Sequence, residues 1–208
     1  MINGKYLLFS VAVVAGMLVF SYWNERRLNT WTMVNDPPGS GAVLCYGDSL
    51  VAGVGAESDD QAYPRWLEQE IGRTVEVLGT PGMTSETGLE TLMQTPSLSA
   101  DVVVVTLGGN DVLRRVPLEQ TTENLRRIFT EFQERGALVA FTAVDSLLGS
   151  RTKPYRELCR ECGVIMIPSV LKNIIDDPDR KHDQIHPNGE GYAIMAERVA
   201  KALDPYLN

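Results

Sequence analysis

The sequence is poor in the residues that build metal centres and disulfide frameworks. It holds three cysteines and two histidines in 208 residues. An odd number of cysteines implies no complete disulfide framework. Cys159 and Cys162 form a C-x-x-C pair, but no second Cys or His pair stands at zinc-site spacing. The pair also falls at the end of an expected helix, where the helix dipole disfavours a thiolate. We therefore expect structural thiols, with a redox pair as the alternative, and no metal or other cofactor.

Positive charge is also scarce, since 19 Lys and Arg face 27 Asp and Glu and give a formal net charge of -8. A chain this acidic is repelled by phosphate backbones, which argues against a nucleic-acid partner. The hydrophobic share of 44% and the charged share of 22% are ordinary for a globular protein with a full core. The length suits one domain with an appendage, which we expect to be a monomer.

The longest uncharged run, YLLFSVAVVAGMLVFSYW, extends from Tyr6 to Trp23. It is just long enough to cross a bilayer as a helix, and aromatic residues stand at both of its ends. A cleaved signal peptide is the alternative, but the following SYWNERRLN offers no good cleavage site. We expect residues 1–23 to form a membrane anchor. One Lys precedes the run and two Arg follow it, so the charges leave its orientation open.

Residues 24–41 read as a linker, because they are polar and end in NDPPGSG, which neither continues a helix nor pairs in a sheet. Residues 42–208 then form the main domain. Five short apolar runs in it indicate buried strands: Ala42–Tyr46, Thr74–Gly79, Asp101–Leu107, Ala137–Val144 and Gly163–Pro168. Helical patterns lie between or after them: Gln61–Gly72, Pro117–Gly136, Thr152–Gly163 and Asn188–Leu203. This alternation predicts an α/β fold with a five-stranded parallel sheet covered by helices on both faces, a three-layer α/β/α sandwich.

Two loops after expected strands carry groups suited to acyl transfer. In GDS, Gly47 permits a sharp turn and Ser49 is expected to begin the next helix, whose free N–H groups suit an oxyanion. The alternative is that Asp48 or Ser49 only caps that helix. In GTPG, Gly82 lets the backbone approach a ligand and donate its N–H, although a simple turn is the better explanation of this loop taken alone.

Two further loops supply an amide and a base. Asn110 follows a strong strand in LGGND, and its side-chain amide can donate to an oxyanion, with a turn as the alternative. In HDQIHP, Asp183 stands three residues before His186 and can orient its ring toward a nucleophile. His182 reads instead as an exposed loop residue.

Together GDS, Gly82, GGND and DQIHP occur in the order of the SGNH hydrolase superfamily, the GDSL esterase/lipase family, which residues 42–203 resemble. GDSLVAGVGA, AYPRWLE, TSETGLETL and LGGNDVLR are most similar to its bacterial thioesterase, lysophospholipase and arylesterase branch. The resemblance implies a flavodoxin-like fold, Ser49 as nucleophile, His186 as general base and Asp183 as its orienting acid. It implies an oxyanion hole made by the N–H groups of Ser49 and Gly82 and the amide of Asn110. One departure is that VEVLGTPG lacks the Asn that the family often has before the second block.

The resemblance implies a serine hydrolase that cleaves carboxylic esters or thioesters, with a small-molecule ester, thioester or lipid as substrate and no metal. The alternative is an O-acetylesterase acting on carbohydrate or a cell-envelope polymer, and a non-catalytic binding module ranks lower because Ser49, Asn110 and His186 are all present. With the anchor, we expect a bacterial inner-membrane protein whose catalytic domain faces the periplasm.

Overall fold

The computed structural model describes residues 29–36, 39, 41–144 and 151–207. The chain divides into two compact units, Met1–Thr32 and Met33–Asn208. All helices and strands named below belong to the second unit. The expected membrane anchor falls on residues outside the described part. Among the residues that the structure does describe, no helix has the length and apolar character needed to span a bilayer.

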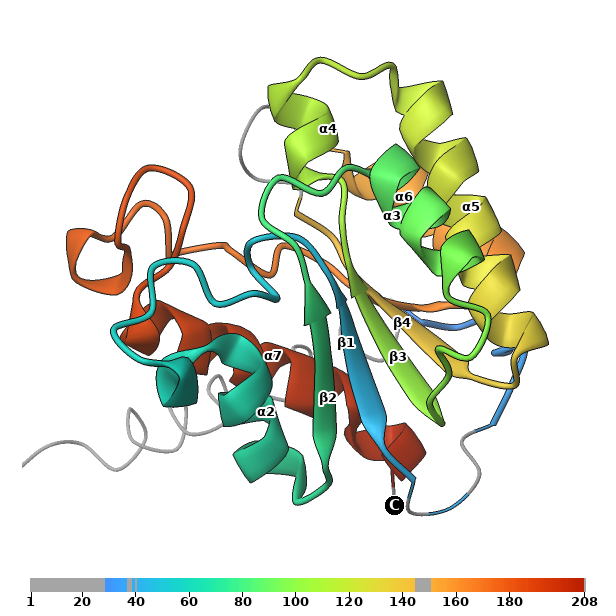
Figure 1. The fold of residues 1–208 in the computed structure, drawn as a ribbon, viewed down its shortest axis with the longest axis horizontal. Coiled ribbons are helices and arrows are strands. Elements are labelled where there is room, and N and C mark those ends of the chain that lie inside the picture. The colour runs from blue at the N-terminus through green and yellow to red at the C-terminus, as the bar shows by residue number, and fades with distance from the viewer. Residues whose placement is uncertain (1–28, 37–38, 40, 145–150, 208) are drawn as a thin grey trace, which may run out of the picture. The chain divides into compact units, whose positions relative to one another are not determined.

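Five parallel strands form one sheet in the order β2-β1-β3-β4-β5 (Figure 1). The strands are β1 (Val43–Gly47), β2 (Val75–Gly79), β3 (Val102–Thr106), β4 (Leu138–Thr142) and β5 (Ile165–Ile167). Every residue of β1, β3, β4 and β5 is buried, as expected for parallel strands with both faces covered. The predicted five-stranded parallel sheet is therefore confirmed, with each strand close to its expected range.

The helices lie on both faces of the sheet and make three layers (Figure 1). They are α2 (Tyr63–Ile71), α3 (Ser85–Gln94), α4 (Gly109–Leu113), α5 (Leu118–Glu134), α6 (Thr152–Cys162) and α7 (Gly189–Leu207), with 3-10 turns η1 (Asp59–Gln61) and η2 (Pro178–Arg180). Alternate residues of β1 face opposite layers. The hydroxyl of Tyr63 on α2 lies 3.0 Å from Cys45 Sγ on one side. On the other side, the Tyr46 ring packs edge-on against Phe132 of α5, with 5.3 Å between the ring centroids.

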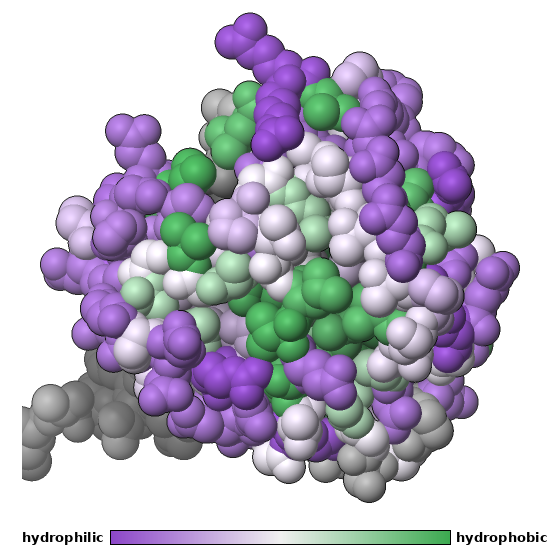
Figure 2. All heavy atoms as spheres, viewed as in Figure 1, coloured by the Kyte–Doolittle hydropathy of each residue, from purple (hydrophilic) through white to green (hydrophobic). Residues whose placement is uncertain are grey.

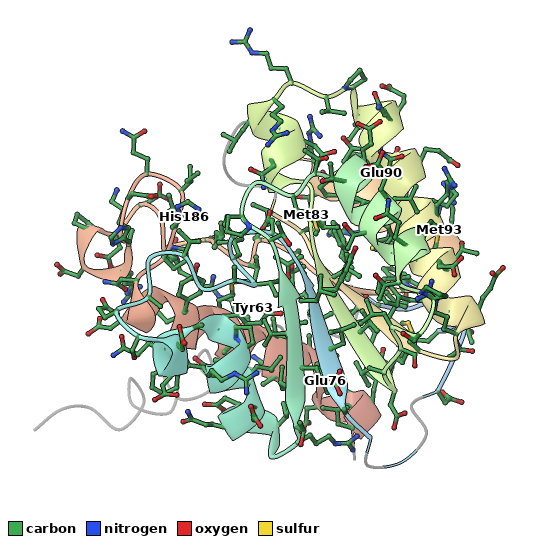
Figure 3. All side chains as sticks on the ribbon, viewed as in Figure 1. Tyr63, Glu76, Met83, Glu90, Met93 and His186 are labelled. Atoms are coloured by element: carbon green, nitrogen blue, oxygen red, sulfur yellow. The ribbon has the colours of Figure 1, made fainter. Side chains whose placement is uncertain are left out.

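The β2 strand is the open edge of the sheet beside β1. Val75 is buried, but the other residues of β2 are only partly covered, and Val77 is 44% exposed. Figure 2 shows hydrophobic residues gathered in the middle of the face that carries this strand in Figure 1. Met93, at the end of α3, is also exposed, and Figure 3 labels it together with Glu76 of β2.

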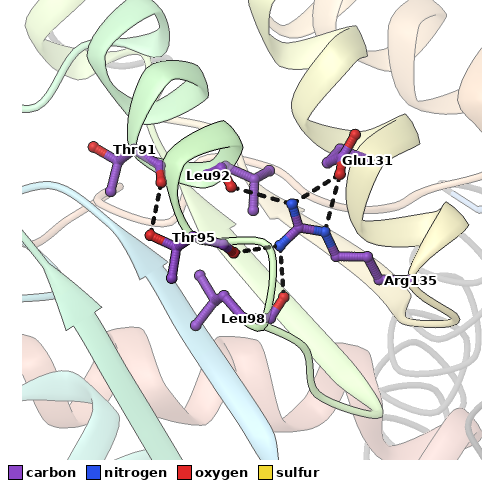
Figure 4. A network of polar contacts seen from close by, with 6 residues as sticks. All are labelled: Thr91, Leu92, Thr95, Leu98, Glu131 and Arg135. Carbon is purple, nitrogen blue, oxygen red and sulfur yellow. Dashed lines mark hydrogen bonds and ion pairs between the residues drawn. The ribbon is translucent and has the colours of Figure 1, made fainter.

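Helices α3 and α4 were not among the expected elements. Helix α3 begins with a capping box in which Thr84 and Thr87 exchange hydrogen bonds between side chains and backbone. It ends against Arg135 of the loop after α5. That guanidinium donates to the carbonyls of Leu92, Thr95 and Leu98 and pairs with Glu131 (Figure 4). A cation therefore adds hydrogen bonds to the carbonyls of Leu92 and Thr95, which also accept backbone N–H groups, and to the carbonyl of Leu98 in the loop after α3.

Candidate active site

The loops that carry the predicted site residues begin side by side at one end of the sheet. In the strand register, Gly47 pairs with Gly79 of β2 on one side and with Thr106 of β3 on the other. The Asp48 N–H donates to the Thr106 carbonyl at 3.2 Å, and the Thr80 N–H donates to the Gly47 carbonyl at 2.9 Å. Residues that follow these three strands consequently emerge next to one another, at the carboxyl edge where parallel α/β sheets bind ligands.

The expectation that Ser49 begins a helix is wrong. Residues 49–55 form successive turns, and the next regular element is η1. The chain starts a helical turn, since the Ala52 N–H donates to the Asp48 carbonyl at 3.0 Å. Gly53 and Gly55 then take positive φ angles of 75° and 98°, which end that turn. Ser49 therefore stands on a tight loop and not at the N-terminus of a helix.

Gly55 also allows the His186 loop to pack closely on the Ser49 loop. A Cβ at Gly55 would lie 2.5 Å from the Pro187 carbonyl oxygen and 2.8 Å from His182 Cβ, so only glycine permits this approach. Helix α7 adds a second tie, because the Tyr192 hydroxyl donates to the Val54 carbonyl at 2.7 Å. The loop that carries His186 is thereby held against the loop that carries Ser49.

The structure brings Ser49, His186 and Asp183 into one hydrogen-bonded chain. His186 Nε2 lies 3.0 Å from Ser49 Oγ, and His186 Nδ1 lies 2.8 Å from Asp183 Oδ2. The other carboxylate oxygen of Asp183 accepts the N–H groups of Ile185 and His186, both at 2.8 Å. His182 is exposed, as predicted, and packs against Gly55. Figure 3 labels His186, which lies on the α7 side of the sheet end.

Asp183 has an acidic carboxyl group. Desolvation by burial is the largest single influence and raises its pKa, but the His186 ring and the N–H groups of Ile185 and His186 together outweigh it. The pKa of Asp183 falls to about 2 as a result. The carboxylate is thus charged at any pH near neutrality. Because a carboxylate can only accept, the Nδ1–H of His186 donates the hydrogen bond to Asp183. In the neutral ring, Nε2 is then free to accept a hydrogen bond from the Ser49 hydroxyl.

The three predicted oxyanion donors differ in whether they are engaged. Among the described residues, nothing accepts a hydrogen bond from the N–H of Ser49 or of Gly82. Gly82 has a φ of 81°, which favours glycine. The Asn110 amide, in contrast, donates to the Met83 carbonyl at 3.0 Å and to Asp48 Oδ2 at 3.2 Å. Met83, labelled in Figure 3, directly follows Gly82, so Asn110 bridges two of the predicted oxyanion loops.

A narrow hollow of about 20 Å³ opens beside Ser49, His186 and Asn110. Its apolar lining consists of Leu50, Leu113, Val144, Leu171 and Ile185. No aromatic side chain of the described residues lines it. A larger hollow of about 880 Å³ lies between the ends of α2 and α7, and it contains none of the predicted site residues.

Two neighbours of the site were not predicted in their observed roles. Asp48 was weighed only as a helix cap, yet its buried carboxyl contacts the Asn110 amide. Arg114 donates to the Gly82 carbonyl at 3.0 Å, beside a predicted oxyanion donor. Both contacts join residues far apart in sequence, so no local pattern marks them. The VLRR that follows GGND is the one available signal for Arg114, because it places a cation about one helical turn after Asn110.

The cysteines and acidic residues do not form another reactive centre among the described residues. Cys45, Cys159 and Cys162 are buried and free, and desolvation raises the pKa of each thiol. No group of three or more His, Cys, Asp or Glu in the described part of the chain is arranged to hold a metal ion.

Comparison with known proteins assigns the family. The profile of the GDSL-like Lipase/Acylhydrolase family matches residues 45–194. The chain is 31% identical to Thioesterase 1/protease 1/lysophospholipase L1 of Escherichia coli strain K12 over 180 residues, which cover 80% of this chain and 85% of that protein. It is 30% identical to the arylesterase of Vibrio mimicus, with 79% and 89% covered.

Solved structures share the fold. The crystal structure of TesA superposes with a TM-score of 0.71 at 24% identity and covers 80% of this chain and 99% of that one. The psychrotrophic esterase EstA of Pseudoalteromonas sp. gives a TM-score of 0.69 at 20% identity, with 80% and 98% covered. A parallel α/β sheet with GDS, Gly82, GGND and DQIHP at one edge, together with these matches, shows that the chain belongs to the GDSL-like lipase/acylhydrolase family and is an ester-cleaving hydrolase.

Proposed function

We propose that Ser49 is the nucleophile of this hydrolase, that His186 is its general base and that Asp183 orients His186. The observation that carries this proposal is the chain of hydrogen bonds from Ser49 Oγ through His186 to Asp183, at 3.0 and 2.8 Å. A serine hydroxyl is a weak nucleophile until a base within this distance takes its proton.

In the proposed reaction, Ser49 Oγ attacks the ester carbonyl carbon while its proton passes to His186 Nε2. The carbonyl electron pair moves to oxygen, and the N–H groups of Ser49 and Gly82 with the Asn110 amide stabilise the resulting oxyanion. Collapse breaks the bond to the leaving group, which takes the proton from His186. Water then attacks the acyl-enzyme, gives its proton to His186 and releases the acid and free Ser49 by the same sequence.

The lining of the site favours an acyl substrate. Leu50, Leu113 and Ile185 offer apolar contact beside Ser49, and the hollow is narrow. An acyl chain gains by leaving water for such a surface, whereas a sugar ring is better matched by polar groups and aromatic faces. We therefore propose carboxylic esters or thioesters of short to medium acyl chains over acetylated carbohydrate.

The experiment combines covalent labelling with a substrate panel. A fluorophosphonate probe should label the wild type and leave Ser49→Ala unlabelled, because only the activated hydroxyl reacts. p-Nitrophenyl esters of rising chain length, acyl-CoA and acetylated sugars then test the substrate class. Highest kcat/KM on acetylated sugars would overturn the acyl-ester proposal, and equal labelling of Ser49→Ala would overturn the nucleophile.

The two histidines provide a matched control. His186→Ala should lose nearly all activity, about 10³-fold or more, because the Ser49 proton then has no acceptor in the described chain of contacts. His182→Ala should stay within about twofold of the wild type. Asp183→Ala should fall between them, because the ring of His186 keeps its contact with Ser49. An inactive His182→Ala would show that the wrong histidine has been chosen.

A further inference from the structure

Asp48 is a buried acid that the proposed proton relay does not use. It directly precedes Ser49, and only 3% of its surface is exposed. Its Oδ1 accepts the Leu50 N–H at 3.0 Å, and its Oδ2 accepts the Asn110 amide at 3.2 Å. No Lys or Arg of the described residues pairs with it. A buried carboxyl without a cation is costly, so its placement needs a reason beyond packing.

The surroundings of Asp48 disfavour its charged form. Desolvation by burial raises its pKa to about 7, Asp111 adds to the rise, and the hydrogen bonds from Leu50 and Asn110 oppose it. Two phenols on helices packed on that side, Tyr63 of α2 and Tyr192 of α7, also have their pKa raised, mainly by desolvation and in addition by the Asp48 carboxylate. Asp48 is therefore an uncompensated acid among groups that are neutral or negative.

The Asn110 amide has only two hydrogens, and both are engaged. One points to Met83 in the loop after β2, and the other points to Asp48 in the loop after β1. An amide held at two points cannot swing freely, so its orientation at the edge of the hollow beside Ser49 is fixed before substrate arrives. An amide preset in this way has only to exchange one hydrogen-bond partner when an oxyanion forms, and it does not have to rotate into place.

We propose that Asp48 is a positioning residue of the oxyanion hole: its carboxyl fixes the Asn110 amide beside Ser49 and releases one N–H to the oxyanion as the tetrahedral intermediate forms. This inference rests on the proposed function of Ser49 and Asn110. The 3.2 Å contact to Asp48 is the longer of the two amide contacts, so it is the one that yields. Asp48 takes no proton in this role and touches no reacting atom.

The test is a double-mutant cycle between Asp48 and Asn110. Asp48→Asn keeps the size of the side chain, but it cannot accept from both Leu50 and Asn110, because one of its terminal atoms is now a donor. We expect kcat on a p-nitrophenyl ester to fall about 10- to 100-fold with KM nearly unchanged. A loss of this size is typical when a catalytic group is slightly misplaced. Asn110→Ala should lose about 10²- to 10³-fold. The double variant should be no slower than Asn110→Ala alone.

Each arm has a decisive outcome. Full kcat in Asp48→Asn, or losses that multiply in the double variant, would overturn the proposal, because Asp48 would then not act through Asn110. Asp48→Ala repeats the cycle without a new donor. Arg135→Ala is the matched control for stability, since it loses a partly buried network far from Ser49 and should keep kcat and KM at a temperature where it is folded. Ser49→Ala distinguishes failure of the Asp48 proposal from failure of the proposed function, because hydrolysis by Ser49→Ala would overturn the proposed function itself.

Discussion

Asp48 and Asp183 are both acids of the proposed catalytic site, yet their surroundings move their pKa values in opposite directions. Asp183 receives three hydrogen bonds and keeps a pKa of about 2. Asp48 is buried beside Asp111 and has a pKa of about 7. The first carboxyl is a stable anion that can balance an imidazolium, and the second is a group that resists charge beside the proposed oxyanion hole.

The raised pKa of Asp48 predicts a pH-dependent stability. The folded state holds this proton up to about pH 7, whereas the unfolded chain releases it near pH 4, so its stabilisation is complete below about pH 4 and is lost as pH rises to about 7. Asp48→Asn cannot ionise. The melting temperature of Asp48→Asn relative to the wild type should therefore rise by several degrees as the pH increases from about 4 to about 8.

Thermal unfolding of both proteins across this range measures the effect. Asp176→Asn is the control, because that acid is exposed, and its difference from the wild type should not follow the same curve. A constant difference between Asp48→Asn and the wild type at every pH would contradict the prediction.

At the scale of elements, α3 depends on a neighbour for its last turn. Arg135 is 12% exposed in its side chain and donates to the carbonyls of Leu92, Thr95 and Leu98, at the end of α3 and in the loop after it (Figure 4). Arg135→Ala removes these charged hydrogen bonds, although Leu92 and Thr95 keep a backbone partner each, and should cost about 2–3 kcal/mol of unfolding free energy. Arg135→Lys should lose less, because an ammonium still donates but cannot reproduce the planar fork.

Urea denaturation tests this through the transition midpoint at an unchanged slope. Arg127→Ala is the matched control on the same helix, as that exposed side chain has no hydrogen bond with the described residues. An equal shift for both variants would contradict the role of Arg135.

The same helix shows where prediction from the sequence stops. The strands are predictable because Val102–Thr106 and Leu138–Thr142 are continuous apolar runs, which need no knowledge of their partners. Helix α3 is not, because SETGLETLMQ contains Gly and Thr, and its stability comes from a capping box and from Arg135. A Cβ at Gly88 would lie 2.8 Å from Leu107 Cδ1, so that glycine serves close packing and not flexibility.

The features of the site also divide into those that the sequence predicts and those that it does not. Ser49, Gly82, Asn110, Asp183 and His186 could be selected because each follows an expected strand or forms a local motif. The helix expected at Ser49 is wrong because Gly53 and Gly55 take positive φ angles that end it within one turn. The contact of Asp48 with Asn110 spans 62 residues and appears only when β1 and β3 lie side by side.

At the scale of the whole molecule, the catalytic unit begins at Met33. Val34 donates its N–H to the Gly163 carbonyl at 3.2 Å, and the Asn35 amide donates to the carbonyls of Gln133 and Ala137. A shortened chain that begins at Met33 keeps these contacts and all of the proposed catalytic residues. We expect it to be soluble and to hydrolyse a water-soluble ester within about twofold of the full chain, since residues 6–23 would supply local concentration at a membrane and no chemistry.

Fractionation of cells that express both forms, with the mature N-terminus determined, tests the proposed anchor. Full-length protein in the soluble fraction with its N-terminus beyond Trp23 would contradict it and indicate a cleaved signal peptide. A chain that begins at Asp36 is the control for the first contacts. It should be less stable than the chain from Met33, because it lacks the hydrogen bonds of Val34 and Asn35.

The pairing of Ser49 with His186 joins positions 137 residues apart. Closing a loop of this length lowers the entropy of the chain before the contact forms, so long-range contacts of this kind form slowly. A nascent polypeptide that ends before Asp183 contains the proposed nucleophile but neither His186 nor its orienting acid. We therefore expect such a chain to be inactive, and we expect the recovery of esterase activity during refolding to follow the formation of this long-range contact.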